Sequence, residues 1–524
     1  MKTVIRVFNG KEYEDRQISY IPGRYIVSIL IAVLETALVV AAVIVIILYV
    51  PWLGYAEVAV QIAVAVVITA SDENPDYKLP WILAVFILPV IGFMLYFLFH
   101  GRRVSRRYVR RASAIWDSTP NHDDSTDLAA LKERSPHAFS QARMLCLSSR
   151  THLYRDEGAA HFSSAEEAFP VLLEDLKKAE KFIFMEYFIV EEGIFWNAIL
   201  GVLEEKAKAG VEVRVIYDDI GSMMTLPGNY AWVLRKKGIL ATPFSVLKPQ
   251  ANSEFNNRSH RKITVIDGKV VHTGGYNLAD EYINAVEKYG HWKDSGLRLS
   301  GAAAQEFTKI LLYSYGTNVK EKDPDYGKYF PAVESAPAAE GDGYLVPFTD
   351  GPEPFYPRRV GQSLIQNMFE TATESVTVTT PYLICDNELM TSIENAALRG
   401  VRVRIITPHV PDKKIIFAMT RSSYARLMKA GAEIYEYKPG FLHQKTVLAD
   451  GKIALVGTIN FDYRSLVHHF ENGVWMYRCA CLKQLAEDQE AVLSESVRIE
   501  RDTVKRGPLR RIFCTILKIF APLM

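Results

Sequence analysis

The chain of 524 residues carries the same polar motif twice, at a constant separation. The motif is His-x-Lys-x4-Asp, and its two copies are His260, Lys262, Asp267 and His443, Lys445, Asp450. A Gly and an Asn follow each copy at matching distances, namely Gly274, Asn277 and Gly457, Asn460. Every matched pair is 183 positions apart, without any insertion. One such motif would be a weak signal, but two copies with the same flanks indicate two halves that fold alike.

The sequence around the motifs predicts an α/β lobe in each half. Residues 208–216 resemble residues 398–406, and both read as the end of a helix, a Gly and an alternating strand. β-rich runs precede them at 182–189 and 375–382, each followed by a helical pattern. Strand, helix and strand in each half favour two pseudo-symmetric lobes with mixed sheets flanked by helices.

The residue types in the motif suit the binding of an anion. A His followed two positions later by a Lys places both side chains on one face of a strand, where they converge on one ligand. Lys supplies a charge suited to phosphate, and the downstream Asn amide can donate to phosphate oxygens. The motif Asp can hold an imidazole in one tautomer, although both Asp residues also begin Asp-Gly pairs typical of turns. A purely structural repeat is less favoured, because two buried His-Lys pairs without an anion would be costly.

The region before residue 101 predicts membrane-spanning helices. Residues 25–50 contain one charge, Glu35, and residues 80–99 contain none, so each run can cross a hydrocarbon core of about 30 Å. A shorter apolar run at 58–70 carries Gln61, which leaves two or three crossings open. Arginines crowd the segment that follows the last run, so the positive-inside rule places the rest of the chain in the cytoplasm. These arginines are Arg102, Arg103, Arg106, Arg107, Arg110 and Arg111.

Charge and cysteine content argue against other classes of protein. With 61 Lys and Arg against 60 Asp and Glu, the net charge of +1 disfavours a dedicated nucleic-acid-binding protein. Five scattered cysteines indicate neither a disulfide framework nor a zinc site, and Cys479 and Cys481 read as core residues of a strand. Residues 501–524 interleave basic and apolar side chains, which fits an amphipathic helix on an anionic membrane or a helix packed on the catalytic body.

The duplicated motif, followed each time by Gly-x-x-Asn, resembles that of the phospholipase D superfamily, in which two halves form one active site. Within that superfamily, the chain is similar to bacterial cardiolipin synthases over nearly its whole length. The similarity rests on residues 74–81, 88–92, 256–262, 275–282, 292–294, 460–465 and 521–524. The departures are the third apolar run, and Gly275 and Thr458 where the superfamily often has Ser.

This resemblance implies a phosphatidyltransferase that converts two molecules of phosphatidylglycerol into cardiolipin and glycerol. One His would form a phosphatidyl-histidine, while the other would act first as acid and then as base. We expect His260 to be the nucleophile, although the symmetry of the repeat leaves His443 open. The implied catalytic residues are His260, Lys262, Asp267, His443, Lys445 and Asp450, with the Asp residues orienting the imidazoles across the lobe interface. The implied phosphate-binding residues are Asn277, Asn460, Lys262 and Lys445. No metal or cofactor is expected.

The expected organisation is that of a multi-pass protein of the bacterial cell membrane with cytoplasmic catalytic lobes. Its expected parts are a tail at 1–24, a transmembrane region at 25–100, a basic juxtamembrane linker at 101–135, lobes at 136–330 and 344–500, a linker at 331–343 and a basic amphipathic segment at 501–524. The expected partners are phosphatidylglycerol and other anionic lipids, and no nucleic acid. Rival interpretations are a hydrolase of the same superfamily, acting on nucleic acid or lipid, and a membrane scaffold without activity.

Overall fold

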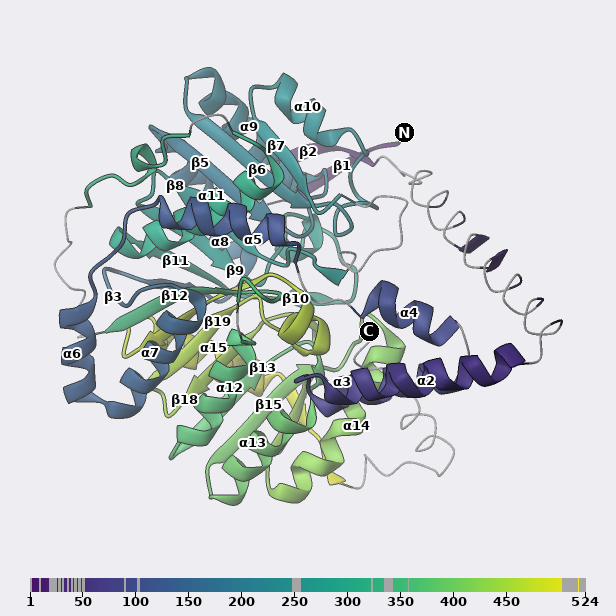
Figure 1. Ribbon diagram of the computed structural model, residues 1–524. Coiled ribbons are helices and arrows are strands. Elements are labelled where there is room, and N and C mark those ends of the chain that lie inside the picture. Colours follow the sequence, from purple (N-terminus) through teal and green to yellow (C-terminus); the bar gives the residue numbers. More distant parts are fainter. Residues whose placement is uncertain are drawn as a thin grey trace.

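The computed structural model describes residues 2–8, 11–17, single helical positions between 26 and 49, and then 52–88, 91–100, 104–246, 256–321, 324–333, 343–356, 358–501 and 517. Two α/β lobes lie against each other, and a group of N-terminal helices lies to one side (Figure 1). The predicted α/β class is confirmed. Most of the run at 25–50 and of the C-terminal segment 501–524 falls outside the described residues.

Lobe 1 (residues 160–318) is built on a seven-stranded mixed sheet in the order β4-β11-β9-β8-β5-β6-β7. Its strands are β4 (Ala160–Phe162), β5 (Phe182–Tyr187), β6 (Glu212–Asp218), β7 (Leu240–Phe244), β8 (Lys262–Ile266), β9 (Val270–Gly274) and β11 (Gly296–Ser300). Strands β5, β6 and β7 are parallel, and β8, β9 and β11 continue the sheet as antiparallel neighbours. Its helices are α8 (Ala165–Lys177), α9 (Ile194–Lys208), α10 (Tyr230–Lys236) and α11 (Ala304–Asn318).

Lobe 2 (residues 344–498) repeats this arrangement in a nine-stranded sheet, in the order β22-β16-β15-β13-β18-β19-β21-β12-β3. Its strands are β3 (Tyr154–Arg155), β12 (Tyr344–Asp350), β13 (Ser375–Thr379), β15 (Arg402–Pro408), β16 (Glu433–Tyr437), β18 (Thr446–Ala449), β19 (Ile453–Gly457), β21 (Glu471–Tyr477) and β22 (Ser496–Arg498). Its helices are α12 (Val360–Thr371), α13 (Asn387–Leu398), α14 (Lys414–Ala430) and α15 (Leu482–Ser494). Strand β18 therefore takes the place that β8 has in lobe 1.

The two lobes share one hydrophobic core. Phe184 and Val265 of lobe 1 belong to the same buried cluster as Val346 and Trp475 of lobe 2. The backbones also cross, because β10 (His291–Lys293) pairs in parallel with β17 (Gly440–Leu442). A second bridge joins Ser259 to Phe470. The lobes are therefore held in a fixed register at the place where both motifs lie.

The segment at 101–135, expected to be a linker, contains two helices. They are α5 (Arg106–Asp117) and α6 (Ser125–Arg134). Helix α5 packs on α11, and its Ala112, Ile115 and Trp116 join the shared core. Ser105 caps α5 by accepting from the amide of Tyr108. Four arginines lie in α5, and this charge explains why the composition suggested a connector although the segment has a helical pattern.

The apolar run at 80–99, which we expected to cross the membrane as one helix, lies in two shorter helices. It is divided between α3 (Pro75–Ile87) and α4 (Ile91–Phe99). Leu88 has a non-helical backbone (φ −118°, ψ 77°), as expected for a residue that precedes a proline. Helices α3 and α4 pack closely, since a Cβ on Gly92 would lie 2.0 Å from the carbonyl oxygen of Ala84. Helix α2 (Trp52–Ala70), which contains the third apolar run, packs on α3.

None of the helices in the described part of the chain is both long enough and apolar enough to span a membrane. The N-terminal tail forms a hairpin of β1 (Lys2–Phe8) and β2 (Lys11–Gln17).

Helix α3 is anchored to lobe 2 through its first turn. The ring of Tyr77 meets the ring of Tyr463 edge-on, with centroids 5.1 Å apart, and Arg359 lies over the other side of Tyr77. The carboxylate of Asp76 accepts from the amide of Asn387 at 2.8 Å. Asn74 donates to Asp386 at 3.1 Å. The first turn of α3 is thus fixed against the start of α13 and against Tyr463, the residue after Asp462.

Candidate active site

The two His-x-Lys segments lie at the start of equivalent strands, and each is tied to the opposite lobe. The backbone amide of His260 donates to the carbonyl of Phe470 at 2.8 Å. The amide of His443 donates to the carbonyl of Lys293, also at 2.8 Å. Both motifs therefore lie on the seam between the lobes, as a single site shared by two halves requires.

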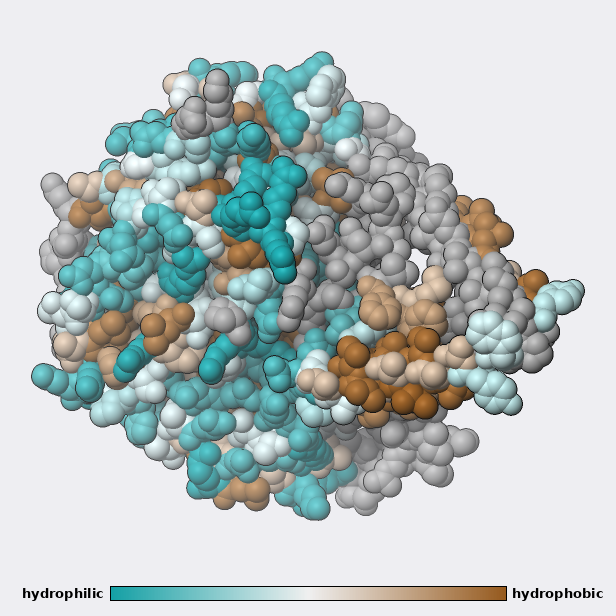
Figure 2. Space-filling model, viewed as in Figure 1, coloured by the Kyte–Doolittle hydropathy of each residue, from teal (hydrophilic) through white to brown (hydrophobic). Residues whose placement is uncertain are grey.

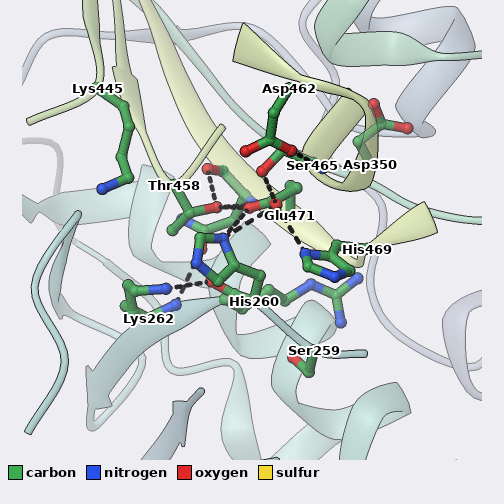
Figure 3. Close-up of polar contacts among 12 residues, drawn as sticks. Ser259, His260, Lys262, Asp350, Lys445, Thr458, Asp462, Ser465, His469 and Glu471 are labelled. Atoms are coloured by element: carbon green, nitrogen blue, oxygen red, sulfur yellow. Dashed lines mark hydrogen bonds and ion pairs between the residues drawn. The ribbon is translucent and has the colours of Figure 1, made fainter. Parts of the chain in front are cut away.

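Each imidazole is held by a carboxylate from the other lobe. Nδ1 of His260 lies 2.9 Å from Oε2 of Glu471, which begins β21 (Figure 3). Nδ1 of His443 lies 2.6 Å from Oδ2 of Asp294, which lies between β10 and β11. A carboxylate only accepts, so both Nδ1 atoms carry the proton and both Nε2 atoms keep a lone pair. This tautomer leaves Nε2 available for attack on phosphorus or for proton transfer.

A hydroxyl network fixes the carboxylate of Glu471. The hydroxyl of Ser465 donates to Glu471 at 2.7 Å, and Thr458 donates to the same carboxylate (Figure 3). Asp294 accepts from the amide of Ser295 at 2.9 Å. Both orienting groups are buried, so neither can rotate freely away from its imidazole.

The motif lysines bring two buried ammonium groups to the site. Nζ of Lys262 donates to the carbonyl of His260 at 2.7 Å, and Nζ of Lys445 donates to the carbonyl of His443. Burial lowers the pKa of Lys262 to about 7 and the pKa of Lys445 to about 8. The charge of Lys445 also lowers the pKa of Lys262. Two cations buried together favour an anion between them, which is what a phosphodiester supplies.

Both catalytic imidazoles are disposed to be neutral in the free site. Burial lowers the pKa of His260 well below its usual value, and the charges of Lys262 and Lys445 lower it further. Burial, followed by the same two lysines, lowers the pKa of His443 in the same way. A neutral imidazole is the form that can act as a nucleophile.

A third imidazole lies beside His260. Nδ1 of His469 is 3.7 Å from Oε1 of Glu471, and the rings of His469 and His260 lie 5.6 Å apart. Atoms of His260, His469 and Glu471 come within 4.8 Å of one another, so these side chains could hold a metal ion. The expectation of a metal-free site therefore stays a prediction.

The motif aspartates do not orient the imidazoles, which corrects our expectation. The carboxylate of Asp267 accepts from the amides of Glu180, Lys181 and Phe182 at 2.7–2.8 Å. The carboxylate of Asp450 accepts in the same way from three amides that lead into β13, those of Thr373, Glu374 and Ser375. Both aspartates have φ of +52°, and a Gly with positive φ follows each. They are hairpin-turn residues that pin the loop before the neighbouring strand.

The two downstream asparagines differ in their surroundings. Oδ1 of Asn277 accepts from the amide of Ile189 at 3.0 Å, and its Nδ2 donates to the hydroxyl of Tyr282 at 2.6 Å. Asn277 therefore braces the loop after β5. Asn460 is also buried, and its Oδ1 has no hydrogen-bond partner among the described residues. Phosphate binding by either amide stays a prediction.

Comparison of the two halves of the sequence missed Asp294 and Glu471, because these residues are not 183 positions apart as the motif residues are. Gly274 and Gly457 are 183 positions apart, but their strand partners Gly296 and Gly473 are 177 apart. Asp294 and Glu471 have the same separation of 177, because the connection in lobe 1 is six residues longer. Each carboxylate lies two residues before that Gly. An acidic residue followed at +2 by Gly, searched with a gap allowed, is the signal that would have revealed the pair.

A histidine pair with two lysines, shared between two α/β lobes, defines an enzyme of the phospholipase D type. The family described as "Cardiolipin synthase, PLD-like domain" matches residues 172–310 and 365–493. The family described as "Phospholipase_D-nuclease N-terminal" matches residues 59–100. The chain belongs to the cardiolipin synthase family of phospholipase D-like enzymes.

Curated relatives cover most of the chain. A cardiolipin synthase of Geobacillus kaustophilus is 33% identical over 88% of this chain and 92% of its own length. A Streptococcus mutans protein described as uncharacterized is 37% identical over 85% of this chain and 96% of its own length. Among solved structures, the phosphatidylserine synthase of Haemophilus influenzae covers 73% of this chain and 97% of its own, with a TM-score of 0.56 and 16% identity. The last likeness supports the fold alone.

Proposed function

We propose that the protein is a cardiolipin synthase that joins two molecules of phosphatidylglycerol through a phosphatidyl-histidine. The observation that carries this proposal is the pair of imidazoles, each oriented by a carboxylate of the opposite lobe, beside two buried lysines. Family membership supports the choice of lipid. The catalytic lobes are assigned to residues 136–330 and 344–500.

In the first step, Nε2 of His260 attacks the phosphorus of one phosphatidylglycerol. The bond from phosphorus to the glycerol headgroup breaks. His443 takes up a proton at Nε2 when the bound phosphodiester anion offsets the charges of the two lysines, and it gives that proton to the departing oxygen. The phosphatidyl group is then bound to His260, and glycerol leaves. Lys262 and Lys445 hold the charge of the phosphoryl oxygens throughout.

In the second step, a hydroxyl of another phosphatidylglycerol takes the place of the departed glycerol. His443, now neutral, accepts its proton, and the oxygen attacks phosphorus while the bond to His260 breaks. This step gives cardiolipin, frees His260 and returns the proton to Nε2 of His443. Glu471 and Asp294 stabilise the positive charge that appears on each imidazole in turn.

Product analysis tests this function. Purified protein in phosphatidylglycerol micelles should give cardiolipin and an equal amount of glycerol. His260→Ala and His443→Ala should each abolish cardiolipin formation, because the full cycle needs both imidazoles. Release of phosphatidic acid instead would indicate a lipid hydrolase. Full turnover by either variant would contradict a shared site and favour two independent half-sites.

We also propose that the N-terminal helices bind the membrane, with the catalytic lobes on its cytoplasmic side. Figure 2 shows an apolar surface over α2 and α3. Its exposed large apolar side chains include Tyr55, Val58, Ile62, Val66, Val67 and Ile87. An exposed apolar patch of this kind is typical of a membrane-contacting surface. The basic residues of α5 would then face the anionic lipids of the inner leaflet.

A further inference from the structure

A small cavity adjoins the active site on the side of lobe 2 that carries the N-terminal helices. Its volume is about 230 Å³, and its walls include Tyr382, Ile384, Lys413, Tyr463 and Arg464. Asp462 also lines it. Ile384 and Tyr463 belong to the cluster that holds Tyr77 of α3, so the cavity lies next to the anchored N-terminal helices.

The cavity is connected to the catalytic groups by a short chain of contacts. The carboxylate of Asp462 accepts from the amide of Ser465 at 2.9 Å, and the hydroxyl of Ser465 donates to Glu471 (Figure 3). Glu471 in turn orients His260. On the other side, the charge of Lys413 is one of those that lower the pKa of His443, after burial and the motif lysines. The cavity therefore shares Asp462 with the hydrogen-bond chain that holds His260, and the charge of Lys413 acts on His443.

Two cations line the cavity without a direct side-chain partner. The side chains of Lys413 and Arg464 are exposed, and within the described ranges neither side chain forms a hydrogen bond or an ion pair. Asp412 accepts from the hydroxyl of Tyr382 at 2.7 Å. Asp462 accepts from the amide of Ser465, and the charges of Arg464 and Lys413 both act on its carboxylate. The side chains that line the cavity comprise two cations and one carboxylate, next to an apolar surface of Ile384 and Ile416. The carboxylate of Asp412 lies outside this lining, on the hydroxyl of Tyr382.

The proposed reaction needs a second phosphate site. The acceptor lipid carries a phosphodiester of its own, one glycerol away from the hydroxyl that attacks. Lys262 and Lys445 are occupied by the phosphoryl group on His260 at that moment. An unneutralised phosphate next to this group would be repelled, so cations must meet it.

We propose that Lys413 and Arg464 bind the phosphodiester of the acceptor phosphatidylglycerol in this cavity. This inference rests on the proposed function and extends it to the choice of acceptor. The apolar wall would receive the beginning of the acceptor's acyl chains and lead them toward α3. A neutral acceptor such as free glycerol needs neither cation, because it has no phosphate.

The test compares two reactions of the same phosphatidyl-enzyme. Cardiolipin formation uses the lipid acceptor, whereas exchange of labelled glycerol into phosphatidylglycerol uses the neutral one. In Lys413→Gln and Arg464→Gln, we expect the ratio of cardiolipin formation to exchange to fall about tenfold for each charge removed. Lys414→Gln is the matched control, since Lys414 is the exposed neighbour of Lys413 and does not line the cavity.

Arg464→Lys keeps the charge and should recover a large part of the ratio that Arg464→Gln loses. A parallel fall of both reactions, or no change of the ratio, would overturn the acceptor site. The proposed function itself would be contradicted if the wild-type protein exchanged glycerol but formed no cardiolipin. The two failures are therefore distinguishable in one set of assays.

Discussion

At the scale of single residues, the site depends on two carboxylates that lie outside the repeated motif. Glu471→Gln and Asp294→Asn should each lower kcat for cardiolipin formation by about a hundredfold or more, because the imidazole loses its tautomer and the stabilisation of its charge. Steady-state kinetics on folded protein checks this. Glu374→Gln, an exposed carboxylate of lobe 2, is the matched control. Activity within threefold of wild type in both site variants would contradict the assigned roles.

The motif aspartates should affect stability instead of chemistry. Asp267→Asn weakens three hydrogen bonds from backbone amides to a charged acceptor, and we expect it to lower the free energy of unfolding by about 2–4 kcal/mol. Thermal denaturation measures this loss. At a temperature where the variant is folded, its kcat should stay within about threefold of wild type. A large loss of kcat with unchanged stability would restore the predicted role in orienting an imidazole.

The buried lysines predict how substrate capture depends on pH. The pKa of Lys262 is lowered to about 7 and that of Lys445 to about 8, so both lose their proton as the pH rises through this range. The free site then loses the charge that attracts phosphate, and kcat/KM should fall between about pH 7 and pH 9. A pH profile of kcat/KM measures this limb. Lys262→Arg, which stays charged, should move the fall to higher pH, and a flat profile would contradict the assignment.

At the scale of elements, sequence patterns succeeded where the chain repeats and failed where it does not. The runs at 182–189 and 375–382 became β5 and β13, and the two motifs lead into β8 and β18. The constant offset missed Asp294 and Glu471 because one connection is longer. The role predicted for Asp267 and Asp450 was wrong because an Asp is equally suited to a hairpin turn and to orienting an imidazole. Such competition between roles is decided by tertiary contacts that one sequence does not contain.

The N-terminal helices show the same limit. Apolar length at 80–99 suggested one span, but a proline inside the run ends α3 at Ile87. Asn74 and Asp76, which precede the apolar run, look like part of an ordinary loop in the sequence. In the structure they bind α3 to lobe 2. An apolar run in the sequence indicates which residues are removed from water, but it does not indicate what they pack against.

The anchor of α3 is testable through Tyr77. Tyr77→Ala removes the edge-on contact with Tyr463 and the contact with Arg359, and we expect the docking of α3 to weaken by about 2–4 kcal/mol. Hydrogen exchange should become faster in Pro75–Ile87 while peptides of both lobes keep their protection. Tyr55→Ala on α2, where the side chain is 82% exposed, is the control. Unchanged exchange in α3 would show that the anchor lies elsewhere.

At the scale of the whole molecule, neither lobe holds a complete catalytic unit. His260 depends on Glu471 and His443 depends on Asp294, and a common core fixes the two sheets against each other. The near-symmetry that identified the site also makes the two histidines hard to tell apart. The two histidines differ in their carboxylate, Glu471 or Asp294, and in the neighbour His469 that lies beside His260.

Capture of the covalent intermediate tests this shared-site mechanism most directly. His443→Ala should slow the second step, and a quench in base preserves the acid-labile bond between phosphorus and nitrogen. Mass spectrometry of the peptide that contains Ser259 to Lys262 should then show a phosphatidyl group on His260. An adduct on His443 in wild-type protein would reverse the two roles. If a competent preparation yields no adduct on either histidine, transfer is direct and the proposed double displacement is wrong.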